Sequence, residues 1–258
     1  MPEGHILHRL ARDQQPLVGH VLAASSPQGR FTDGAETLDG RRLELVEAYG
    51  KHLHHRYDAG AELHVHLGMQ GKWIRLSAER PARGQVRLRL TDSVVAWDLI
   101  APATCRLLDP GEWKALLGAL GPDPLLPDAE PEEAWRRLHA YRGAVGAALL
   151  DQSVVAGVGN VFRAEALFAA GVHPARPAAG LGRPDFDRLW EILVEMMRRA
   201  VDEYRIVTVP ETSDGERLPE HQSRMVYKQQ SCRRCGTVVV TPTIGGRTAY
   251  ACPLCQPG

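Results

Sequence analysis

Pro2 and Glu3, at the start of the chain, are the residues whose types could do covalent chemistry. A Met-Pro start can lose Met1 because the next residue is small, and the new terminus is then a secondary amine beside a carboxylate. Such an amine, on attacking a sugar aldehyde carbon, forms an iminium that cannot shed an N–H proton and is therefore a strong electron sink. Most Met-Pro starts have no such role, so the rest of the chain must supply a substrate.

The cysteines form the motif with the most diagnostic spacing. Four of the five lie in two Cys-x2-Cys pairs with 16 residues between the pairs: Cys232, Cys235, Cys252 and Cys255. This spacing predicts one structural Zn2+ held by four thiolates, with no ligand position left open for catalysis. The metal would fold a hairpin too small for a core of its own, with strands over 238–240 and 248–251 and a Gly245-Gly246 turn. Cys105 is expected to be a buried, inert thiol.

Asn160 and Arg247 are candidates for anion binding, each with an ordinary alternative. Asn160 follows Gly157 and Gly159 at the predicted start of a helix, where unpaired N–H groups favour an anion. It could equally be a helix N-cap. Arg247 lies next to the predicted hairpin turn, either as a solvated side chain or as a contact to a phosphate or an unpaired base.

Lys51 is one of only four lysines, and it follows Gly50, which suggests tight backbone packing around a lysine on a strand. Several histidines crowd the same region: His52, His54, His55, His64 and His66. A histidine metal site is one interpretation. Polar packing, or a place near a phosphate, is favoured because the pattern offers no carboxylate partner on the same face.

Composition narrows the class of protein. The chain has 258 residues, 44% hydrophobic and 24% charged, as in an ordinary globular protein of one large or two smaller domains. It has no 18-residue apolar run and no signal-peptide pattern, so we expect a location in the cytoplasm or nucleoid. The formal net charge is zero, which removes any argument for nucleic-acid binding from bulk charge.

The last 38 residues, 221–258, are different, because they hold five Lys or Arg residues and no Asp or Glu. A basic excess confined to one segment is typical of a local nucleic-acid contact. Four thiolates and Zn2+ together carry a charge of −2, so this excess falls to about +3 with the metal bound.

The elements that must position these residues follow from periodicity. A helix is predicted over the first fifteen residues, and short strands over 43–57, 63–67, 73–76, 86–90 and 94–99 indicate a β-sandwich or barrel. A proline- and glycine-marked linker follows at 121–131. Helices are predicted over 134–150, 162–170 and the amphipathic stretch 186–204, which we assign to the core. A loop is expected over 206–224.

Taken together, these motifs resemble the formamidopyrimidine-DNA glycosylase / endonuclease VIII family over nearly the whole chain. Each motif is weak alone, but their common order is specific. They are Pro2-Glu3-Gly4, Gly50-Lys51, His66-Leu-Gly-Met-Gln-Gly71, Leu120-Gly-Pro-Asp, Asp151-Gln152 through Gly159-Asn160 into Arg163-Ala-Glu-Ala-Leu-Phe168, Gly246-Arg247, and Cys252-Pro-Leu-Cys255-Gln256.

The resemblance implies an α+β fold in three parts: an N-terminal β-sandwich catalytic domain with an N-terminal helix (1–120), a helical helix-two-turn-helix DNA-binding domain (121–220) and a four-cysteine zinc-finger β-hairpin (221–258). It also implies a monomer that acts on double-stranded damaged DNA. The reaction would be base-excision repair by a bifunctional glycosylase and abasic-site lyase.

Residue roles are implied in the same way. Pro2 would attack C1′ and expel the base, and Glu3 would move protons. Lys51 would contact the phosphate at the lesion and assist proton transfer. Asn160 and Arg247 would grip the flanking phosphates, with Arg247 also counted among the catalytic residues. Met69, with Gln70 beside it, would fill the space left by the extruded base.

Departures from the family pattern bear on the substrate. Gly4 is typical of endonuclease VIII, which favours oxidised pyrimidines. The stretch 100–105 lacks the Arg-x-Phe of the 8-oxoguanine branch, although His66-Leu-Gly-Met69 resembles that branch and the endonuclease VIII sequence Gln-Leu-Tyr is absent. We therefore favour pyrimidine lesions over 8-oxoguanine or formamidopyrimidine, with weak discrimination of the opposite base.

Two functions of other classes remain as alternatives. A non-catalytic zinc-containing protein that binds damaged DNA would need neither Pro2 nor Glu3 and would tolerate an N-terminal tag. A zinc-ribbon scaffold for protein partners would leave Lys51 and the Asn160 turn unexplained.

Overall fold

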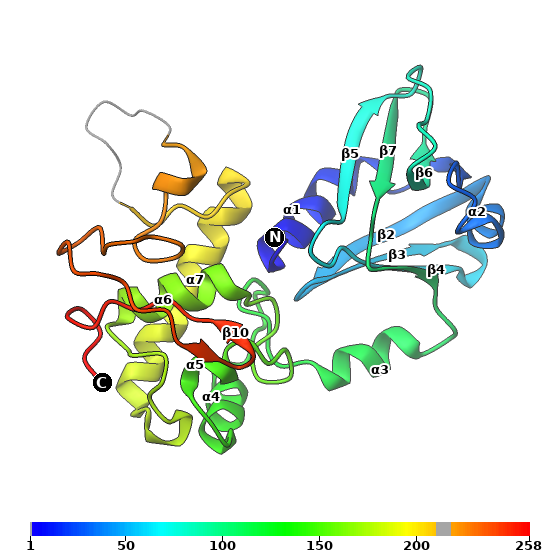
Figure 1. Ribbon diagram of the computed structural model, residues 1–258. Helices are drawn as coiled ribbons and strands as arrows, with labels where there is room; N and C mark the ends of the chain where they lie inside the picture. Colours follow the sequence, from blue (N-terminus) through cyan, green and yellow to red (C-terminus); the bar gives the residue numbers. More distant parts are fainter. Residues whose placement is uncertain (1, 210–217) are drawn as a thin grey trace. The chain divides into compact units, whose positions relative to one another are not determined.

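The computed structural model describes residues 2–209 and 218–258 (Figure 1). The chain divides into two compact units, Met1–Gly118 and Ala119–Gly258, and each is described by itself. The N-terminal unit begins with α1 (Gly4–Gln14), which confirms the helix predicted over the first fifteen residues. Its buried side chains include Leu7, Leu10 and Ala11, and the helix packs against strands β2 and β3.

Eight strands form the body of the N-terminal unit, hydrogen-bonded in the order β5-β7-β6-β1-β2-β3-β4-β8. Only two residue pairs join β1 to β2, so the order separates into two halves, and Figure 1 shows β5, β6 and β7 running across β2, β3 and β4. Apolar side chains from both halves share one core, as in a sandwich. The strands are β1 (Val21–Ser25), β2 (Arg41–Tyr49), β3 (His52–Tyr57), β4 (Glu62–His66), β5 (Lys72–Ser77), β6 (Val86–Thr91), β7 (Val95–Ile100) and β8 (Thr104–Leu107).

The predicted run 43–57 forms two strands instead of one. β2 ends at Tyr49, and a tight turn at Gly50 and Lys51 leads into β3, with Gly50 at φ +56°. The alternation of apolar residues cannot show this break, because a two-residue turn interrupts the pattern only briefly. Gly50 is the only local signal of the turn. Two helices of this unit were not predicted: α2 (Thr32–Leu38) and α3 (Glu112–Ala119), which ends at the unit boundary.

The C-terminal unit is built on four helices, α4 (Pro131–Ala140), α5 (Val145–Ala148), α6 (Asn160–Ala170) and α7 (Arg183–Glu203). The prediction of a single helix over 134–150 is wrong, because two helices, α4 and α5, occupy this stretch. The chain leaves the helical conformation at Tyr141, and Ala144 is extended and pairs with Pro177. Gly143, at φ +159°, makes this break possible, since few other residues adopt that angle.

The other two helical predictions are confirmed. α6 ends at Gly171, which takes the left-handed conformation with φ +69°. α7 buries the predicted amphipathic stripe, including Phe186, Leu189, Leu193 and Met197. The described residues also contain four short 3-10 turns: Gln15–Leu17, Asp58–Gly60, Ala178–Gly180 and Glu220–Gln222. The predicted loop 206–224 lies partly outside the described residues.

The cysteine-bearing hairpin, with β9 (Thr243–Ile244) and β10 (Arg247–Thr248), belongs to the same compact unit. Its buried residues Cys232, Val239 and Cys252 are part of one apolar cluster with α6 and α7. Bridges pair Val240 with Ala251 and Ser231 with Val238. The hairpin therefore shares its hydrophobic core with α6 and α7. No helix among the described residues is both long and apolar enough to cross a bilayer.

Candidate functional site

Pro2 and Glu3 lie at the start of α1. Pro2 is half-buried, whereas the side chain of Glu3 is 1% exposed. Glu3 has the extended backbone of an N-cap residue, and its carbonyl accepts a hydrogen bond from Ile6 N at 3.0 Å, but its carboxylate makes no capping bond. The carboxylate is therefore buried next to Pro2 in the chain without capping the helix.

Lys51 lies in the β2–β3 turn and not on a strand, which corrects our expectation. The turn is set by Gly50 at φ +56°. α1 packs on the two strands that this turn connects, so the helix that carries Glu3 and the turn that carries Lys51 are held by the same pair of strands.

The histidines near Lys51 form a stacked layer. His52 Nδ1 lies 2.9 Å from His64 Nε2, and the His52 ring centroid lies 5.1 Å from those of both His64 and His66. Burial is the main cause that lowers the pKa of His52 to about 3 and that of His64 to about 4. The rings are uncharged at neutral pH, and their mutual contacts are those of polar packing.

His54 is also buried, but unlike His52, His64 and His66 it contacts carboxylates. Its ring nitrogens lie 2.9 Å from Glu47 Oε1 and 3.1 Å from Glu62 Oε2, and its ring stacks on Trp113 of α3 at 4.5 Å between centroids. Trp113 Nε1 also donates to Glu47 at 2.8 Å. These contacts hold Trp113, in the first turn of α3, against β2 and β3.

Met69 is presented by a tight loop, 67–71, between β4 and β5. Gly71 N donates to Leu67 O at 3.0 Å, and a Cβ on Gly71 would meet that oxygen at 2.2 Å. Gly68 has φ +67° and faces Ala103, whose Cβ would lie 2.7 Å from an added Cβ. The loop thus requires both glycines, and it holds Met69 with 69% of its surface exposed and Gln70 also exposed.

The neighbouring connection, from β7 to β8, is only residues 101–103. It consists of Ala101, at φ +47°, followed by Pro102 and Ala103. It carries no long side chain, so Met69 has no large partner from this connection. Cys105 lies just beyond it on β8, and burial raises the pKa of its thiol to about 12, consistent with an inert residue.

In the C-terminal unit, the turn that leads into α6 is braced by Gln152. Its Nε2 donates to Leu150 O at 2.9 Å and to Val158 O at 3.0 Å, and its Oε1 accepts from Gly157 N at 3.0 Å. Gly157 has φ +86°. One side chain therefore fixes the turn that places the N-terminus of α6.

Asn160 is the first residue of α6 and not its N-cap, because Gly159 occupies that position. The N-cap interpretation is wrong. Instead, Asn160 Nδ2 donates to Thr248 O of β10 at 3.1 Å, and Asn160 Oδ1 accepts from Arg163. The amide nitrogen carries two hydrogens, so this bond to Thr248 uses one of them. The side chain links α6 to the hairpin.

Arg163 and Glu165, both buried on α6, belong to a motif quoted from the sequence but were given no role there. The Arg163 guanidinium donates to Ile244 O at 2.9 Å, Thr248 O at 2.8 Å and Gly146 O at 3.3 Å. The signal was present, because every other residue over 161–168 is apolar. A helix apolar all round is buried, so its charged residues must have partners.

The Glu165 carboxylate holds the segment before the first cysteine pair. It accepts from Met225 N at 2.8 Å, Val226 N at 3.0 Å and Tyr227 N at 2.7 Å, and also from the Thr208 hydroxyl. Backbone N–H groups bonded to an ionised carboxylate form the stronger class of hydrogen bond. α6 thereby anchors both strands of the hairpin through Arg163 and the preceding segment through Glu165.

Arg247 is exposed at the start of β10, directly after Gly245 and Gly246. Both glycines have positive φ, +63° and +70°, as a two-residue type I′ hairpin turn requires. An added Cβ on Gly245 would lie 3.2 Å from Ala147 of α5. The hairpin tip therefore rests on a helix, which fixes the backbone that presents Arg247.

The four cysteines lie together with the geometry of a metal site. Their Sγ atoms all lie within 4.8 Å of one another, with separations of 3.5, 3.6 and 3.9 Å for three of the pairs. Four thiolates around a tetrahedral ion at about 2.3 Å would have sulfurs about 3.8 Å apart. Within residues 2–209 and 218–258, no other set of three His, Cys, Asp or Glu ligand atoms is close enough to share an ion.

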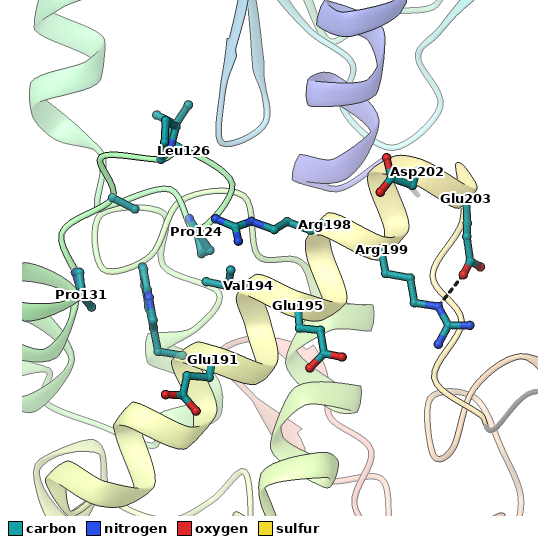
Figure 2. A pocket seen from close by; sticks show the side chains of 13 residues that line it. Pro124, Leu126, Pro131, Glu191, Val194, Glu195, Arg198, Arg199, Asp202 and Glu203 are labelled. Atoms are coloured by element: carbon teal, nitrogen blue, oxygen red, sulfur yellow. Dashed lines mark hydrogen bonds and ion pairs between the residues drawn. The ribbon is translucent and has the colours of Figure 1, made fainter.

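A cavity of about 740 Å³ lies elsewhere in the C-terminal unit, between α7 and the segment 124–131 (Figure 2). One wall is rich in proline, and the other carries acidic side chains, including Glu191 and Glu195, beside Arg198 and Arg199. Its carboxylates would repel phosphates. None of the predicted site residues lines it.

The predicted site residues thus form two sets, one in each unit. Pro2, Glu3, Lys51, Met69 and Gln70 belong to the N-terminal unit, and Asn160, Arg247 and the cysteines to the C-terminal unit. In the C-terminal unit, direct hydrogen bonds join the predicted Asn160, and Arg163 beside it, to Thr248, the residue that follows Arg247.

Two family descriptions match this chain. Residues 1–99 match the formamidopyrimidine-DNA glycosylase N-terminal domain, and residues 120–210 match the formamidopyrimidine-DNA glycosylase H2TH domain.

Curated relatives agree over their full length. The chain is 44% identical over 268 residues to "Endonuclease 8 1" of Mycobacterium tuberculosis (strain ATCC 25618 / H37Rv), covering 99% of this chain and 100% of the relative. It is 36% identical over 289 residues to the formamidopyrimidine-DNA glycosylase of Thermomicrobium roseum, covering 100% and 99%.

Solved structures share the fold. A Lactococcus lactis formamidopyrimidine-DNA glycosylase bound to DNA containing N7-benzyl-Fapy-dG superposes with a TM-score of 0.81 at 21% identity, covering 100% of both chains. The Lactococcus lactis enzyme bound to DNA with an abasic site gives a TM-score of 0.80 at 21% identity, covering 99% of this chain and 100% of that one.

Proposed function

The chain belongs to the formamidopyrimidine-DNA glycosylase / endonuclease VIII family of base-excision-repair DNA glycosylases, and on that premise we propose that it is bifunctional, with Pro2 as the nucleophile of both the glycosylase and the abasic-site lyase step. The observation that carries the proposal is the buried carboxylate of Glu3 beside the N-terminal Pro2, which helix capping does not explain.

The covalent steps balance with Pro2 as a free secondary amine. Its nitrogen forms a bond to C1′ as the N-glycosidic bond breaks, the base leaves with a proton, and the sugar ring opens to give an iminium. The iminium acidifies the C2′ hydrogens, and loss of one expels the 3′ phosphate by β-elimination. A second elimination expels the 5′ phosphate. An α-amino group titrates near pH 8, so a useful fraction is unprotonated at neutral pH.

Glu3 and Lys51 assist this chemistry. Glu3 supplies a proton to the sugar ring oxygen as the ring opens, and its burial keeps it in a fixed position. Lys51, held in the β2–β3 turn, neutralises the phosphate at the lesion and helps to move the proton. The sequence of steps requires removal of Met1, which lies outside the described residues.

DNA binding is assigned to residues of both units. Asn160 and Arg247 contact phosphates that flank the lesion. Gln152 fixes the turn that leads to Asn160, and Arg163 fixes the strand that carries Arg247. Met69, exposed on its two-glycine loop, occupies the space left by the extruded base, with Gln70 beside it. Extrusion costs roughly a few kcal/mol, and an apolar wedge offsets part of that cost.

The favoured substrates are DNA duplexes that contain oxidised pyrimidines. Support comes from Gly4, from the three-residue β7–β8 connection and from the 44% identity to an endonuclease 8. Because residues 101–103 carry no long side chain, discrimination of the opposite base should be weak. A panel of lesion duplexes, with each lesion opposite all four bases, tests this; a strong preference for 8-oxoguanine opposite cytosine would contradict it.

The metal is proposed to be Zn2+, bound by Cys232, Cys235, Cys252 and Cys255. The sulfur positions and the knuckle bonds fit this ion, because Arg234 N and Cys255 N each donate to a cysteine sulfur at 3.4 Å. Four thiolates leave no open position, so the ion stabilises the hairpin that presents Arg247 and takes no part in the reaction.

Borohydride trapping tests the central step. Protein with Met1 removed, mixed with an abasic duplex and sodium borohydride, should form a covalent adduct that denaturation does not break. Pro2→Gly should weaken the adduct and an N-terminal extension should abolish it, while Pro16→Gly, elsewhere in the same unit, is the matched control. Absence of any adduct with correctly processed protein would sink the lyase proposal.

A further inference from the structure

The turn 226–229, which precedes the first cysteine pair, has an unexpected residue at its third position. Gln229 N donates to Val226 O at 3.1 Å, and the third residue of the turn, Lys228, has φ +57°. Turns of this kind call for glycine or asparagine at that position, because a Cβ there is strained.

Lys228 differs from the other residues that share this strain. Among the residues the structure describes, four that are not glycine have positive φ: Ala59, Ala101, Tyr204 and Lys228. Only Lys228 is charged, and it is exposed and one of the four lysines of the chain. Strain of this kind persists where the surroundings enforce it, and it clusters at ligand-binding sites.

The support of the turn is rigid on both sides. Glu165 accepts hydrogen bonds from the backbone N–H groups of Val226 and Tyr227 within the turn. On the other side, Arg233 N of the first knuckle donates to Met225 O at 3.2 Å. The position of Lys228 is therefore set both by Glu165 of α6 and by the first cysteine knuckle.

The charge of Lys228 is available to an anion. Its Nζ lies 5.7 Å from the centroid of the Tyr227 ring, and in the described ranges no carboxylate forms an ion pair with it. Arg224 lies near the same ring, with Cζ at 5.6 Å, but its guanidinium is paired with Glu220 at 2.9 Å. Two cations thus lie near one aromatic ring, and only the lysine lacks a counter-charge there.

The turn is also joined to the residues assigned to DNA. The Tyr227 ring packs edge-on against Tyr250, with 5.0 Å between centroids. Tyr250 lies two residues after Thr248, whose carbonyl accepts the bond from Asn160. Helix α6 carries both Asn160, which bonds to the hairpin at Thr248, and Glu165, which bonds to the turn that holds Lys228. The hairpin and the turn are therefore held by the same helix.

We propose that Lys228 binds a DNA backbone phosphate, as a third phosphate contact of the C-terminal unit beside those of Asn160 and Arg247, and that this charge is the reason a strained lysine occupies a position suited to glycine. The inference rests on the proposed function, since it presumes that this face of the C-terminal unit meets DNA. The charge distribution agrees, because residues 221–258 contain basic residues and no acidic ones.

The strain makes a clean variant possible. Lys228→Gly removes the charge and relieves the backbone at the same time, so we expect it to weaken binding without destabilising the fold. Lys228→Arg keeps the charge. Lys114→Ala, on exposed α3, removes one positive charge elsewhere and controls for net charge. The probe is a fluorescent duplex with a tetrahydrofuran abasic analogue, titrated by anisotropy from 50 to 200 mM salt.

One phosphate contact contributes about 0.9 to the slope of log K against log salt. The affinity ratio of wild type to Lys228→Gly should therefore fall about 3.5-fold across this fourfold salt range, with the melting temperature of the variant unchanged or higher. Lys228→Arg and Lys114→Ala should keep the wild-type slope. An unchanged slope in Lys228→Gly, or a lower melting temperature, would overturn the proposal. If wild type itself neither binds the duplex nor traps an abasic substrate, the proposed function has failed instead.

Discussion

Arg163 Nη2 donates a hydrogen bond to the carbonyl of Thr248 at 2.8 Å, from a side chain with no exposed surface. This bond joins β10 of the cysteine-bearing hairpin to the first turn of α6, next to both Arg247 and Asn160. A buried guanidinium is costly unless its donors find acceptors, and here it bonds to three carbonyls and one amide oxygen. The hairpin and the helix are therefore energetically coupled.

Arg163→Ala should destabilise the C-terminal unit. Hydrogen bonds to a charged group contribute roughly 1.5–3 kcal/mol each, and several buried carbonyls would lose their donor, so the free energy of unfolding should fall by at least about 2 kcal/mol. Denaturant titration measures this. Arg136→Ala is the control, because Arg136 is 70% exposed and its surface ion pair contributes little. Equal effects of the two variants would show that Arg163 is not a structural link.

Removal of the metal should disorder the hairpin while sparing the N-terminal unit. The hairpin shares a core with α6 and α7, but its two knuckles bring four sulfurs within metal-binding distance, and such sites are usually stable only with the ion bound. About one zinc per chain should be measured by mass spectrometry, and a chelator should abolish DNA binding. Cys232→Ser should act in the same way, with Cys105→Ser as the matched control. Full DNA affinity without metal would refute this role.

Glu3→Gln should separate the two activities. Base removal needs a proton at the opening sugar ring, whereas a preformed abasic site already offers an aldehyde to Pro2. We expect excision from a lesion duplex to fall by roughly 10²–10⁴-fold, the usual contribution of general acid–base catalysis, with a smaller loss on abasic DNA. Single-turnover assays on both substrates measure the ratio. Equal losses on both would place Glu3 in the lyase step as well.

Met69→Ala should impair extrusion and leave stability unchanged. The side chain is 69% exposed, so its removal creates no cavity. Excision of a base from a duplex should slow, because the wedge no longer offsets the cost of extrusion. The same lesion beside a mismatch, where unpairing costs less, should be excised with a smaller loss. Val94→Ala, also an exposed apolar residue at 70%, is the control. An unaltered duplex rate would argue against the wedge.

The histidine layer predicts loss of stability in mild acid. Burial lowers the pKa of His52 to about 3 and that of His64 to about 4, below the ordinary value of about 6.5. Between these values the unfolded chain binds protons that the folded chain does not, so stability falls as pH drops from about 6.5 towards 4, by up to about 1.4 kcal/mol per pH unit for each ring.

Melting temperatures at pH 7 and pH 5 check this expectation. His52→Gln should flatten the dependence, because it removes one ring that the unfolded state protonates. His139→Gln, an exposed residue on α4, should leave the dependence as in wild type. If stability were the same at both pH values, the rings could not be neutral and buried as the structure has them.

Local patterns in the sequence determined much of this protein. The spacing of the cysteines predicted their cluster, because two knuckles on one hairpin converge wherever the hairpin lies. The apolar period of α7 predicted its buried face, and the ordered motifs identified the family. These features depend on residues close together in the chain, so propensity and periodicity are sufficient to find them.

Only the tertiary structure decided the rest. It moved Lys51 into a turn, divided the predicted helix 134–150, and gave Asn160 a bond to Thr248 in place of a cap. It also revealed the roles of Arg163, which bonds to Thr248 85 residues away, and of Glu165, which bonds to Met225 60 residues away. The role of a buried charged residue depends on its hydrogen-bond partners. When these partners come from distant segments of the chain, only the tertiary structure identifies them.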